Sequence, residues 1–594
     1  MQLSMHRTQV ALHAALAISN LALAVAVPPP PPPNHLPPPP PSTKHCRVLP
    51  GDAEWPSQQE WTKLNQTIGG RLISSVPLGQ ACYVPTISAD RPECAKLRDE
   101  WVDPKTYYED PVNVMSPFWL NNSCTAFIGP AASGTCILGN MASFAVEVDG
   151  PKTVADALKF AKEKNMRISI KNTGHDYIGR SNGKGSLALW THKLRTMSFI
   201  DYKGRDYHGP ALKAGAGVQF MDAYKAAADK GLRVLGGYCS SVGMVGGYVQ
   251  GGGHGPLAAS YGMAADNTLE FEVVTVDGRH LVASPTQNSD LYWALSGGGG
   301  GNYAVVLSAT VKAHPDGQTA GAALAFANTD PETYWKAVGE FQKHLLYLNT
   351  IPGLATSWGF DNRTFSLDSA TLTGGTKERI SSLLDPFVQK LKQLNMTLLR
   401  NDATDHSRFY DQYTKYGFPP EVYSTNNTIG GRLIPPSTVE KNLGGLVGAF
   451  RRIATDGRWP NRISAISLNV THARVGNQPG ANAVLPAWRD ALYTLNLGIG
   501  FPADTPWPEL QAIQAAANEW QALFTPLTPD GGGYMNEATW DNPTWKADYF
   551  GANYEKLLQV KRRYDPEFAL WQHTSVGADV YWQPDPEGRL CRVR

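Results

Sequence analysis

Glycine crowds one uncharged segment of this 594-residue chain, Gly236-Gly237-Tyr238-Cys239-Ser240-Ser241-Val242-Gly243-Met244-Val245-Gly246-Gly247-Tyr248-Val249-Gln250-Gly251-Gly252-Gly253-His254-Gly255. Nine of its twenty residues are glycine, and none is Asp, Glu, Lys or Arg. Glycine lacks a Cβ atom, so it lets the backbone adopt unusual conformations and approach a ligand closely. The segment therefore predicts backbone pressed against a large planar ligand and its phosphates, rather than a flexible linker.

Two more segments place glycine at the end or the start of an expected strand. The first is Lys171-Asn172-Thr173-Gly174-His175-Asp176-Tyr177-Ile178-Gly179-Arg180-Ser181, and the second is Gly297–Gly301, before a strand expected over Asn302–Ala313. Glycines at a strand end free backbone N–H groups to face an anion, and Arg180 and Ser181 add donors. A surface turn is the simpler interpretation of either segment taken alone. Neither is a Walker A motif or a Gly-x-Gly-x-x-Gly fingerprint, which argues against a nicotinamide dehydrogenase.

Three motifs, taken in order, resemble those of one flavoprotein family. They are Asn172-Thr173-Gly174-His175-Asp176, Cys239-Ser240-Ser241-Val242-Gly243, and Asp290-Leu291-Tyr292-Trp293-Ala294 before a glycine run. The chain, from about residue 46 to its end, resembles the berberine-bridge-enzyme-like branch of the vanillyl-alcohol-oxidase (PCMH-type) flavoproteins, closest to a secreted fungal subgroup that includes isoamyl-alcohol-oxidase-like members. The resemblance implies an α+β fold, with a two-subdomain PCMH-type FAD-binding domain and a substrate domain.

The resemblance assigns a covalent role to two residues. It implies that His175 links to the 8α-methyl group of FAD and that Cys239 links to C6 of the isoalloxazine ring. The simpler alternatives are a polar turn histidine and a buried free cysteine. Further FAD contacts are implied for Asn172, Thr173, Gly174, Asp176, Gly179, Arg180, Ser181, Val242, Gly243, Gly246, Gly247, Gly252, His254, Gly255, Asn302 and Asn536. No metal site is expected.

One departure from plant relatives bears on oxygen reactivity. Met244 and Val245 both stand between Val-Gly and Gly-Gly, where plant relatives have a single residue. That region adjoins the flavin in the family and influences oxygen access. The fungal subgroup shares the longer form, so an oxidase remains the expectation.

The candidate catalytic residues lie near the C-terminus, in Gly533-Tyr534-Met535-Asn536-Glu537. This segment resembles the Tyr-x-Asn segment over the flavin in relatives, which makes Tyr534 the candidate base for a substrate hydroxyl. A phenol with a pKa near 10 is a poor base at neutral pH unless its surroundings lower that pKa. Glu537 is either a residue that tunes Tyr534 or a surface carboxylate.

The implied reaction is hydride transfer from an alcohol or carbohydrate carbon to bicovalently bound FAD, followed by reduction of O₂ to H₂O₂. The cofactor supplies the difficult chemistry, and the protein supplies orientation and electrostatics. Three alternatives stay open: an oxidase or cyclase that tailors a secondary metabolite, a flavin dehydrogenase with poor O₂ reactivity, and a non-catalytic carbohydrate-binding protein that kept the fold.

The N-terminus predicts secretion. Residues 1–26 have the pattern of a signal peptide, with Arg7, an apolar run over Ala11–Ala24 and a small-x-small site. A buried N-terminal helix is the alternative. Residues 27–45 form a proline-rich linker, which favours an extended chain. Six N-x-S/T sequons follow, at Asn65, Asn121, Asn362, Asn395, Asn426 and Asn469.

Seven cysteines agree with an oxidising, extracellular compartment. We expect disulfides between Cys82 and Cys94, Cys124 and Cys136, and Cys46 and Cys591, although spacing alone does not fix the connectivity. The odd count leaves one cysteine over. Cys239 is the natural candidate, because it lies in the glycine-rich segment far from the others.

Helix and strand patterns divide the rest of the chain. We expect an irregular, cysteine-rich part over 46–137, the FAD-binding domain over 138–315, a substrate domain over 316–530 and a C-terminal segment over 531–594 that returns to the FAD domain. The substrate domain should be an antiparallel sheet backed by helices. Its expected helices are Pro331–Leu348, Lys377–Leu394 and Trp507–Leu523, and one expected strand is Ala465–Val470.

The composition of the chain argues against a nucleic-acid partner and against a membrane span. The formal net charge is +1, and charged residues make up 18% of the chain, so there is no electrostatic reason to expect a nucleic-acid partner. No apolar run of 18 residues follows the N-terminal segment, so no membrane span is expected. The expected partners are a small-molecule alcohol or oligosaccharide and O₂, and we expect a monomer.

Overall fold

The computed structural model describes residues 45–83, 92–116, 123–127, 136–417 and 426–593. The expected signal peptide, nearly all of the proline-rich linker and the sequon at Asn121 lie outside the described residues. Contacts group Thr43–Arg594 into one unit, and every element named below belongs to it.

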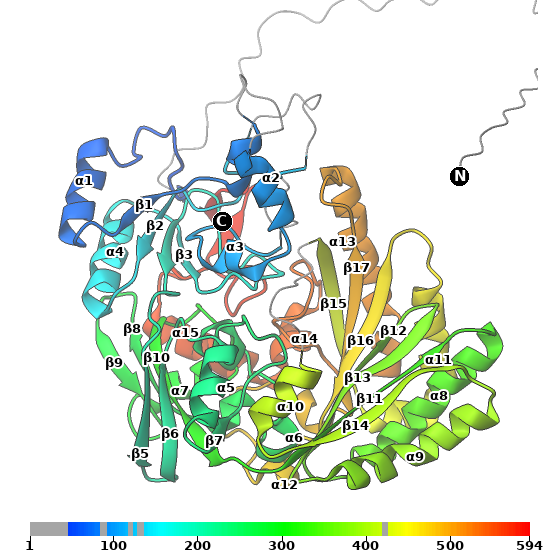
Figure 1. The fold of residues 1–594 in the computed structure, drawn as a ribbon. Coiled ribbons are helices and arrows are strands. Elements are labelled where there is room, and N and C mark those ends of the chain that lie inside the picture. Colours follow the sequence, from blue (N-terminus) through cyan, green and yellow to red (C-terminus); the bar gives the residue numbers. More distant parts are fainter. Residues whose placement is uncertain (1–44, 84–91, 117–122, 128–135, 418–425, 594) are drawn as a thin grey trace, which may run out of the picture. The chain divides into compact units, whose positions relative to one another are not determined.

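The first sheet has four strands in the order β1-β2-β4-β3 (Figure 1). Strands β2 and β3 both run parallel to β4, and β1 pairs with β2 antiparallel. Helices α1 and α4 share an apolar core with these strands. The elements are α1 (Gln58–Thr67), β1 (Leu72–Ser74), β2 (Phe144–Glu147), α4 (Pro151–Glu163), β3 (Ile168–Lys171) and β4 (Leu187–Trp190).

The part over 46–137 is more regular than predicted. Besides α1 it contains α2 (Pro92–Asp99) and α3 (Pro104–Tyr108). Helix α1 begins behind Ser57, whose hydroxyl accepts the backbone N–H of Glu60 while the Glu60 carboxylate accepts the N–H of Ser57. This reciprocal cap follows from a Ser-x-x-Glu pattern that is visible in the sequence. The prediction of irregular structure was wrong at these helices.

The second sheet is antiparallel, in the order β5-β6-β10-β8-β9, with β7 paired to the end of β10. Strand β10 (Val305–Pro315) begins later than the predicted Asn302, because the glycine turn still holds the preceding residues. The hydroxyl of Tyr303 donates to the Gly298 carbonyl at 2.9 Å within that turn. The other elements are β5 (Met197–Lys203), β6 (His208–Gly215), α5 (Phe220–Ala228), β7 (Leu232–Val234), α6 (Ala258–Tyr261), β8 (Thr268–Val274), β9 (His280–Ala283) and α7 (Ser289–Leu295).

The third sheet has seven antiparallel strands in the order β14-β11-β13-β12-β16-β17-β15. It begins at Thr319, just after β10 ends. Its strands are β11 (Thr319–Ala327), β12 (Leu354–Phe360), β13 (Thr364–Thr373), β14 (Leu398–His406), β15 (Asn427–Ile434), β16 (Asn461–Ser467) and β17 (Tyr493–Gly500). Its helices are α8 (Pro331–Leu348), α9 (Lys377–Gln393), α10 (Phe409–Tyr416), α11 (Pro436–Ala454), α12 (His472–Val475) and α13 (Trp507–Ala522).

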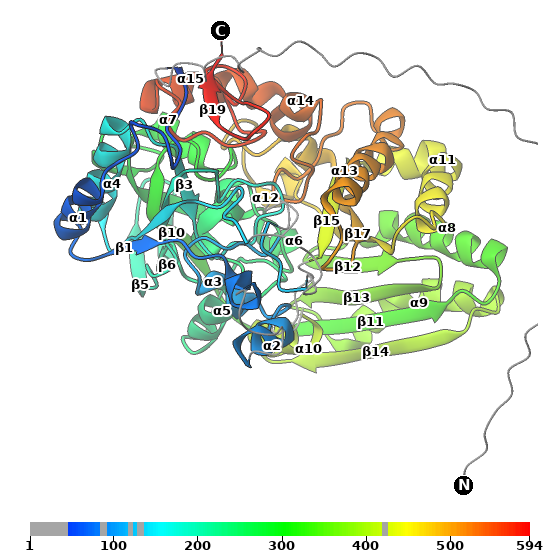
Figure 2. The same cartoon turned by 90° about the horizontal axis from the view of Figure 1, so that it is seen from above.

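Side-chain alternation gives this sheet one apolar and one polar face. In β16, Ile463 and Ala465 are buried in a core that also contains residues of α8, α9, α11 and α13. Figures 1 and 2 show α8 and α11 on the same side of the sheet. Arg462 and Ser464 alternate with those residues and therefore point to the opposite face. The predicted helix-backed antiparallel sheet is confirmed.

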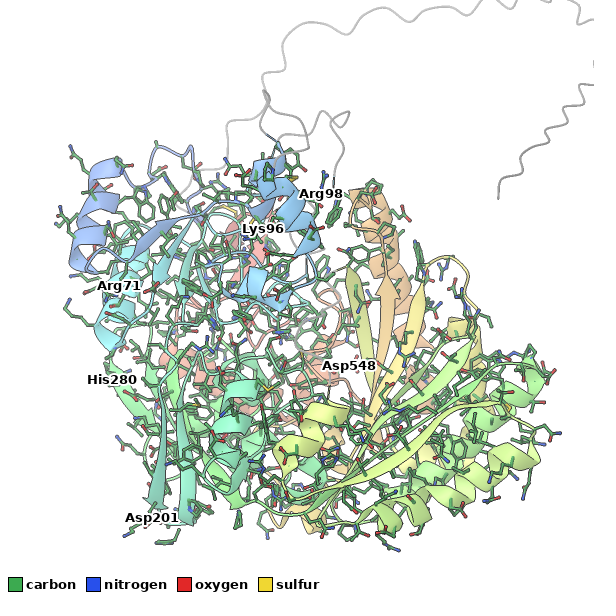
Figure 3. All side chains as sticks on the ribbon, viewed as in Figure 1. Arg71, Lys96, Arg98, Asp201, His280 and Asp548 are labelled. Carbon is green, nitrogen blue, oxygen red and sulfur yellow. A yellow bond between two sulfur atoms is a disulfide. The ribbon has the colours of Figure 1, made fainter. Side chains whose placement is uncertain are left out.

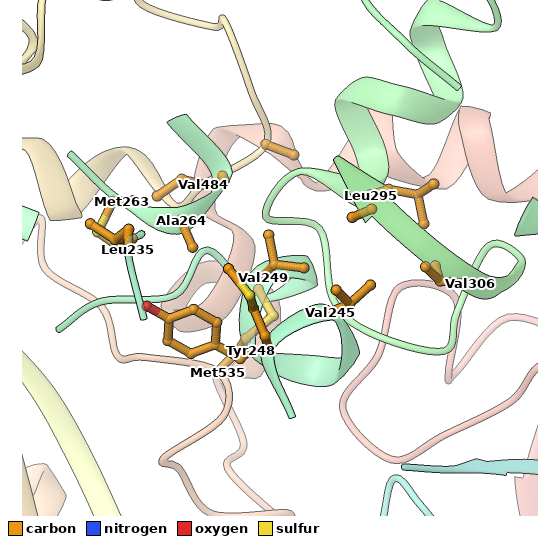
Figure 4. Packing of buried hydrophobic residues seen from close by; sticks show 14 of the residues in the cluster. Leu235, Val245, Tyr248, Val249, Met263, Ala264, Leu295, Val306, Val484 and Met535 are labelled. Atoms are coloured by element: carbon orange, nitrogen blue, oxygen red, sulfur yellow. The ribbon is translucent and has the colours of Figure 1, made fainter. Parts of the chain in front are cut away.

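The C-terminal segment contacts both halves of the unit. It contains α14 (Trp545–Phe550), α15 (Tyr554–Tyr564) and a hairpin of β18 (Trp582–Pro584) and β19 (Leu590–Arg592). Asp548, labelled in Figure 3, forms a buried ion pair with Arg432 of β15 at 2.7 Å. Lys561 donates to the carbonyl of Asn302 at 2.5 Å. Met535 packs in the same apolar cluster as Val245 and its neighbours (Figure 4).

The disulfides pair as predicted. Cys46 bonds to Cys591, Cys82 to Cys94, and Cys124 to Cys136. Cys239 remains free. Because six cysteines are used in this way, the thiol in the glycine-rich segment is available for other chemistry.

Candidate active site

A cavity of about 690 Å³ lies between the first two sheets, the polar face of the seven-stranded sheet and the start of the C-terminal segment. This volume is within the range of small-molecule and cofactor sites. Distant parts of the chain line it. They include the loop after β3, the glycine-rich segment, part of residues 300–306, strands β12, β13, β16 and β17, residues 534–537 and Gln572.

His175 and Cys239 come together at one point of this cavity. Ser241 Oγ lies 2.8 Å from His175 Nε2 and 3.8 Å from Cys239 Sγ. The ring nitrogen and the sulfur are therefore separated by no more than the sum of these two distances. Both side chains line the cavity, so one ligand can touch both.

Burial sets the protonation state of both residues. It lowers the pKa of His175 to about 3, and the nearby positive charge of Lys171 acts in the same direction. The imidazole is therefore neutral at neutral pH, the state in which a ring nitrogen is nucleophilic. Burial also raises the pKa of the Cys239 thiol, although its hydrogen bonds with Ser241 oppose the shift. The thiol is therefore protonated.

Asp176 shapes the loop that carries His175. Its carboxylate accepts the backbone N–H of Ile178 at 3.1 Å and that of Ser181 at 2.6 Å. These bonds stabilise the turn of the loop. They also mean that these two N–H groups donate to Asp176 and not to a ligand anion, as the sequence had led us to expect of N–H groups in this loop. At the start of the loop, Asn172 donates to the Ala216 carbonyl. The loop is thereby fixed to the backbone that directly follows β6 of the second sheet.

Arg180 ties the same loop to the C-terminal segment. Its guanidinium lines the cavity and donates to the backbone carbonyls of Met535 at 2.9 Å, Thr574 at 3.0 Å and His573 at 3.4 Å. Hydrogen bonds from a charged donor are stronger than neutral ones. Arg180 therefore holds the backbone beside Tyr534 in place, in addition to facing the cavity.

Replacing Arg180 by glutamine should destabilise the fold by about 2–4 kcal/mol, because several carbonyls lose a charged donor. Urea unfolding followed by tryptophan fluorescence measures this change. Arg205→Gln is the control, since Arg205 is an exposed arginine paired with its neighbour Asp206. Equal stability of the two variants would contradict the role of Arg180.

The predicted catalytic residues face the cavity beside two others. Glu537 Oε2 accepts a hydrogen bond from Asn496 Nδ2 at 2.9 Å and lies 3.7 Å from His254 Nε2. Asn536 Nδ2 donates to the Tyr534 hydroxyl at 2.9 Å. The rings of His254 and Tyr534 pack edge to face, with centroids 4.8 Å apart. Glu537 is thus part of the cavity wall rather than an outer surface carboxylate.

The two catalytic candidates differ in protonation. Burial raises the pKa of Tyr534 above its ordinary value of 10, and the negative charge of Glu537 adds to the shift. Burial also acts to raise the pKa of Glu537, but His254 and the hydrogen bond from Asn496 outweigh it, and the pKa lies below its ordinary value. At neutral pH the carboxylate is ionised, whereas the phenol keeps its proton.

Most of the predicted site residues line this cavity. They are Asn172, Thr173, Gly174, His175, Asp176, Arg180, Ser181, Cys239, Val242, Gly243, Gly246, Gly247, His254, Tyr534, Asn536 and Glu537. Gly179, Gly252, Gly255 and Asn302 are not in its wall. A Cβ on Gly255 would lie 1.8 Å from the Gly236 carbonyl oxygen, so this glycine serves backbone packing. Asn302 is buried and donates to the Val576 carbonyl at 3.3 Å.

The sequence predicted a substrate domain over 316–530 but singled out none of the residues that its seven-stranded sheet contributes to the cavity wall. Ser357, Asp368, Arg462, Ser464 and Asn496 all line the cavity. A signal existed in β16, where polar and apolar residues alternate as they do in a half-buried strand. Which residues of the other strands lie beside those of β16 depends on the register of strand pairing, and no local sequence pattern encodes that register.

Close relatives cover almost the whole chain. It is 39% identical over 555 residues to the FAD-linked oxidoreductase patO of Penicillium expansum, covering 93% of this chain and 95% of patO. It is 39% identical over 569 residues to the bifunctional decalin synthase calF of Penicillium decumbens, covering 92% of this chain and 96% of calF. Residues 142–284 match the family model of an FAD binding domain, and residues 533–577 match that described as berberine and berberine like.

The chain belongs to the berberine-bridge-enzyme-like FAD-linked oxidases of the vanillyl-alcohol-oxidase/PCMH superfamily.

Solved structures agree with this family. The crystal structure of the VAO-type flavoprotein MtVAO615 from Myceliophthora thermophila C1 is similar to this chain with a TM-score of 0.86 and 41% identity, covering 92% of this chain and 100% of that one. The predicted α+β PCMH-type fold and an FAD-linked oxidoreductase are confirmed. The glucooligosaccharide oxidase of Acremonium strictum, which carries 6-S-cysteinyl, 8α-N1-histidyl FAD, shares the fold at 21% identity and a TM-score of 0.61, covering 74% of this chain and 92% of that one.

The cavity wall fits the cofactor of this family. A Cβ added to Gly247 would meet no atom within 4 Å, so the backbone there leaves room for a ligand. Asn172 Oδ1 and Gln572 Oε1 are buried acceptors in the wall that have no hydrogen-bond partner among the described residues. Buried acceptors need donors, and a flavin N–H and ribityl hydroxyls supply them. His175, Cys239, Asn172 and Gln572 are therefore residues that would hold FAD.

The described residues contain no group of three or more His, Cys, Asp or Glu side chains arranged to hold a metal ion. Within the same parts of the chain, none of the helices is both long and apolar enough to span a membrane.

Proposed function

We propose that the protein is a secreted oxidase that oxidises an alcohol or carbohydrate hydroxyl with FAD attached to both His175 and Cys239. The observation that carries the proposal is the convergence of these two side chains on Ser241 Oγ. The bicovalent FAD of glucooligosaccharide oxidase supports it, because a histidine and a cysteine are the linking residues there. Bound FAD supplies a two-electron acceptor, so that CH–OH becomes C=O by loss of a hydride and a proton, and O₂ is reduced to H₂O₂.

The substrate proton goes to Glu537 in this proposal. Glu537 is ionised at neutral pH and faces the cavity, so it has both the charge and the position of a general base. Tyr534, the base predicted from the sequence, keeps its proton and is better suited to donate a hydrogen bond to the substrate oxygen. His254 and Asn496 hold the carboxylate in place.

The substrate class has a second candidate. The similarity to a decalin synthase supports a secondary-metabolite tailoring oxidase or cyclase on the same fold. The polar residues on the sheet face of the cavity favour the first candidate, a hydroxylated substrate. A dehydrogenase with poor O₂ reactivity would use the same residues, and peroxide release separates it from an oxidase.

Secretion, glycosylation and domain division belong to the same proposal. Three disulfides support an oxidising compartment, because such bonds are rare in the cytosol. We propose a monomer with an FAD domain over 138–315, a substrate domain over 316–530 and a returning segment over 531–594.

The purified protein should be yellow and should release H₂O₂ with a carbonyl product from at least one member of a panel of alcohols, oligosaccharides and phenolics. Peroxidase-coupled detection measures the peroxide, and stopped-flow absorbance measures flavin reduction. Flavin reduction without peroxide would indicate a dehydrogenase. A colourless protein would favour a binding protein and contradict the proposed function.

A further inference from the structure

A row of facing residues crosses four strands of the seven-stranded sheet. Ser366 of β13 pairs with Gly359 of β12, Gly359 pairs with Ser464 of β16, and Ser464 pairs with Asn496 of β17. Directly paired residues point to the same face of a sheet. Ser464 and Asn496 line the cavity, so this polar row lies on the cavity face.

The polar row starts at the proposed base and leads away from it. Asn496 donates to Glu537 at one end. Neighbouring strands are about 4.8 Å apart, so three intervals place Ser366 about 14 Å from Asn496. A substrate that reacts beside Glu537 and follows the row would reach β13 with its far end.

Arg462 and Asp368 stand at that far end. Arg462 Nη2 donates to Ser366 Oγ at 2.8 Å and lies 3.5 Å from Asp368 Oδ2. A Cβ on Gly359 would lie 3.0 Å from Arg462 Nη2 and 3.2 Å from its Cζ. The absence of a side chain at Gly359 thus gives the guanidinium room to lie across β12.

Both charged groups retain capacity for a ligand. Their side chains are 43% and 36% exposed, and both line the cavity. Among the described residues, the hydrogen bonds that Arg462 donates use Nη2, which leaves Nε and Nη1 to donate to a ligand. Asp368 contributes a carboxylate acceptor beside them. The opposite charges cancel, so the pair suits a neutral group that both donates and accepts, as a hydroxyl does.

We propose that Arg462 and Asp368 form an outer binding point for a hydroxyl-bearing, uncharged end of an elongated substrate, about 14 Å along the polar row from the reacting end. The inference rests on the proposed function only for the position of the reacting end.

The test is calorimetric binding of cellotriose and maltotriose, neutral chains with hydroxyl groups along their length, to the flavin-loaded protein. Wild-type protein should bind at least one of them. Arg462→Met should weaken that binding about ten- to hundred-fold, because hydrogen bonds from a charged donor are lost. Asp368→Asn, which preserves the side-chain shape, should weaken it in the same direction.

Arg451→Met is the matched control. Arg451 pairs with Glu332 on the helix side of the same domain, and its side chain is also 43% exposed. This variant should bind the trisaccharides as the wild type does. Thermal melting of each variant shows that a loss of binding is not a loss of fold.

Three results would overturn the inference: no binding of either trisaccharide by the wild type, equal affinity in Arg462→Met, or tighter binding of trigalacturonate than of both neutral chains. Oxidation is not part of this readout. A protein that binds a trisaccharide through Arg462 but releases no peroxide from any member of the panel would contradict the proposed function and leave the outer binding point standing.

Discussion

Glu537→Gln should lower the rate constant of flavin reduction by about two to four orders of magnitude, the range that general acid–base catalysis contributes. The amide keeps the size of the side chain but cannot accept the substrate proton. Tyr534→Phe should cost less, about ten-fold, because it removes one hydrogen bond to the substrate. Anaerobic stopped-flow measurement of flavin reduction gives both values. Glu519→Gln, on the surface of α13, is the control.

The pH profile separates the two candidate bases. The pKa of Glu537 lies below its ordinary value of 4.5, and the base form exists above that pKa. Activity should therefore be level at neutral pH and be lost as the pH falls through the pKa of Glu537. A Tyr534 base would instead give activity that still rises near pH 10, because its pKa is raised. That profile, with a Tyr534→Phe variant slower than Glu537→Gln, would refute the assignment to Glu537.

Removing both proposed tethers should release all of the flavin. His175→Ala and Cys239→Ala should each leave the flavin attached through the other residue, with an altered absorbance spectrum in the Cys239 variant. The double variant should lose its flavin on acid precipitation. Fluorescence of the protein band in a denaturing gel measures attachment. Ser240→Ala, next to Cys239 and outside the cavity wall, is the control. Flavin that stays attached in the double variant would show that neither residue is the link.

The local elements were largely predictable because their signals are local. Helix α8 has the predicted bounds, and α9 and α13 each end one residue early. Strand β16 was misplaced: the prediction was Ala465–Val470, and the strand is Asn461–Ser467. The prediction was based on the apolar residues near Val470. The strand itself is marked by the alternation of polar and apolar residues around Arg462. Asn469 lies beyond the end of β16, and its side chain donates to the Asn349 carbonyl.

The residues of the candidate site also fall into two groups, those that a local motif identifies and those that only long-range contacts bring together. His175, Cys239 and Tyr534 lie in distinctive motifs, so sequence could name them as candidates. Arg180 was expected to face an anion, but its donors meet backbone carbonyls from residues more than 350 positions away. Asp368 and Arg462 have no motif and meet only through the register of a long-range sheet. Such contacts follow from topology and packing, which a single sequence does not display.

The most direct test is mass spectrometry of peptides from the proteolysed, yellow protein. Attachment through both residues predicts one cross-linked species in which the peptide carrying His175 and the peptide carrying Cys239 are joined through a single flavin. Recovery of both peptides unmodified, with all of the flavin free in solution, would contradict it.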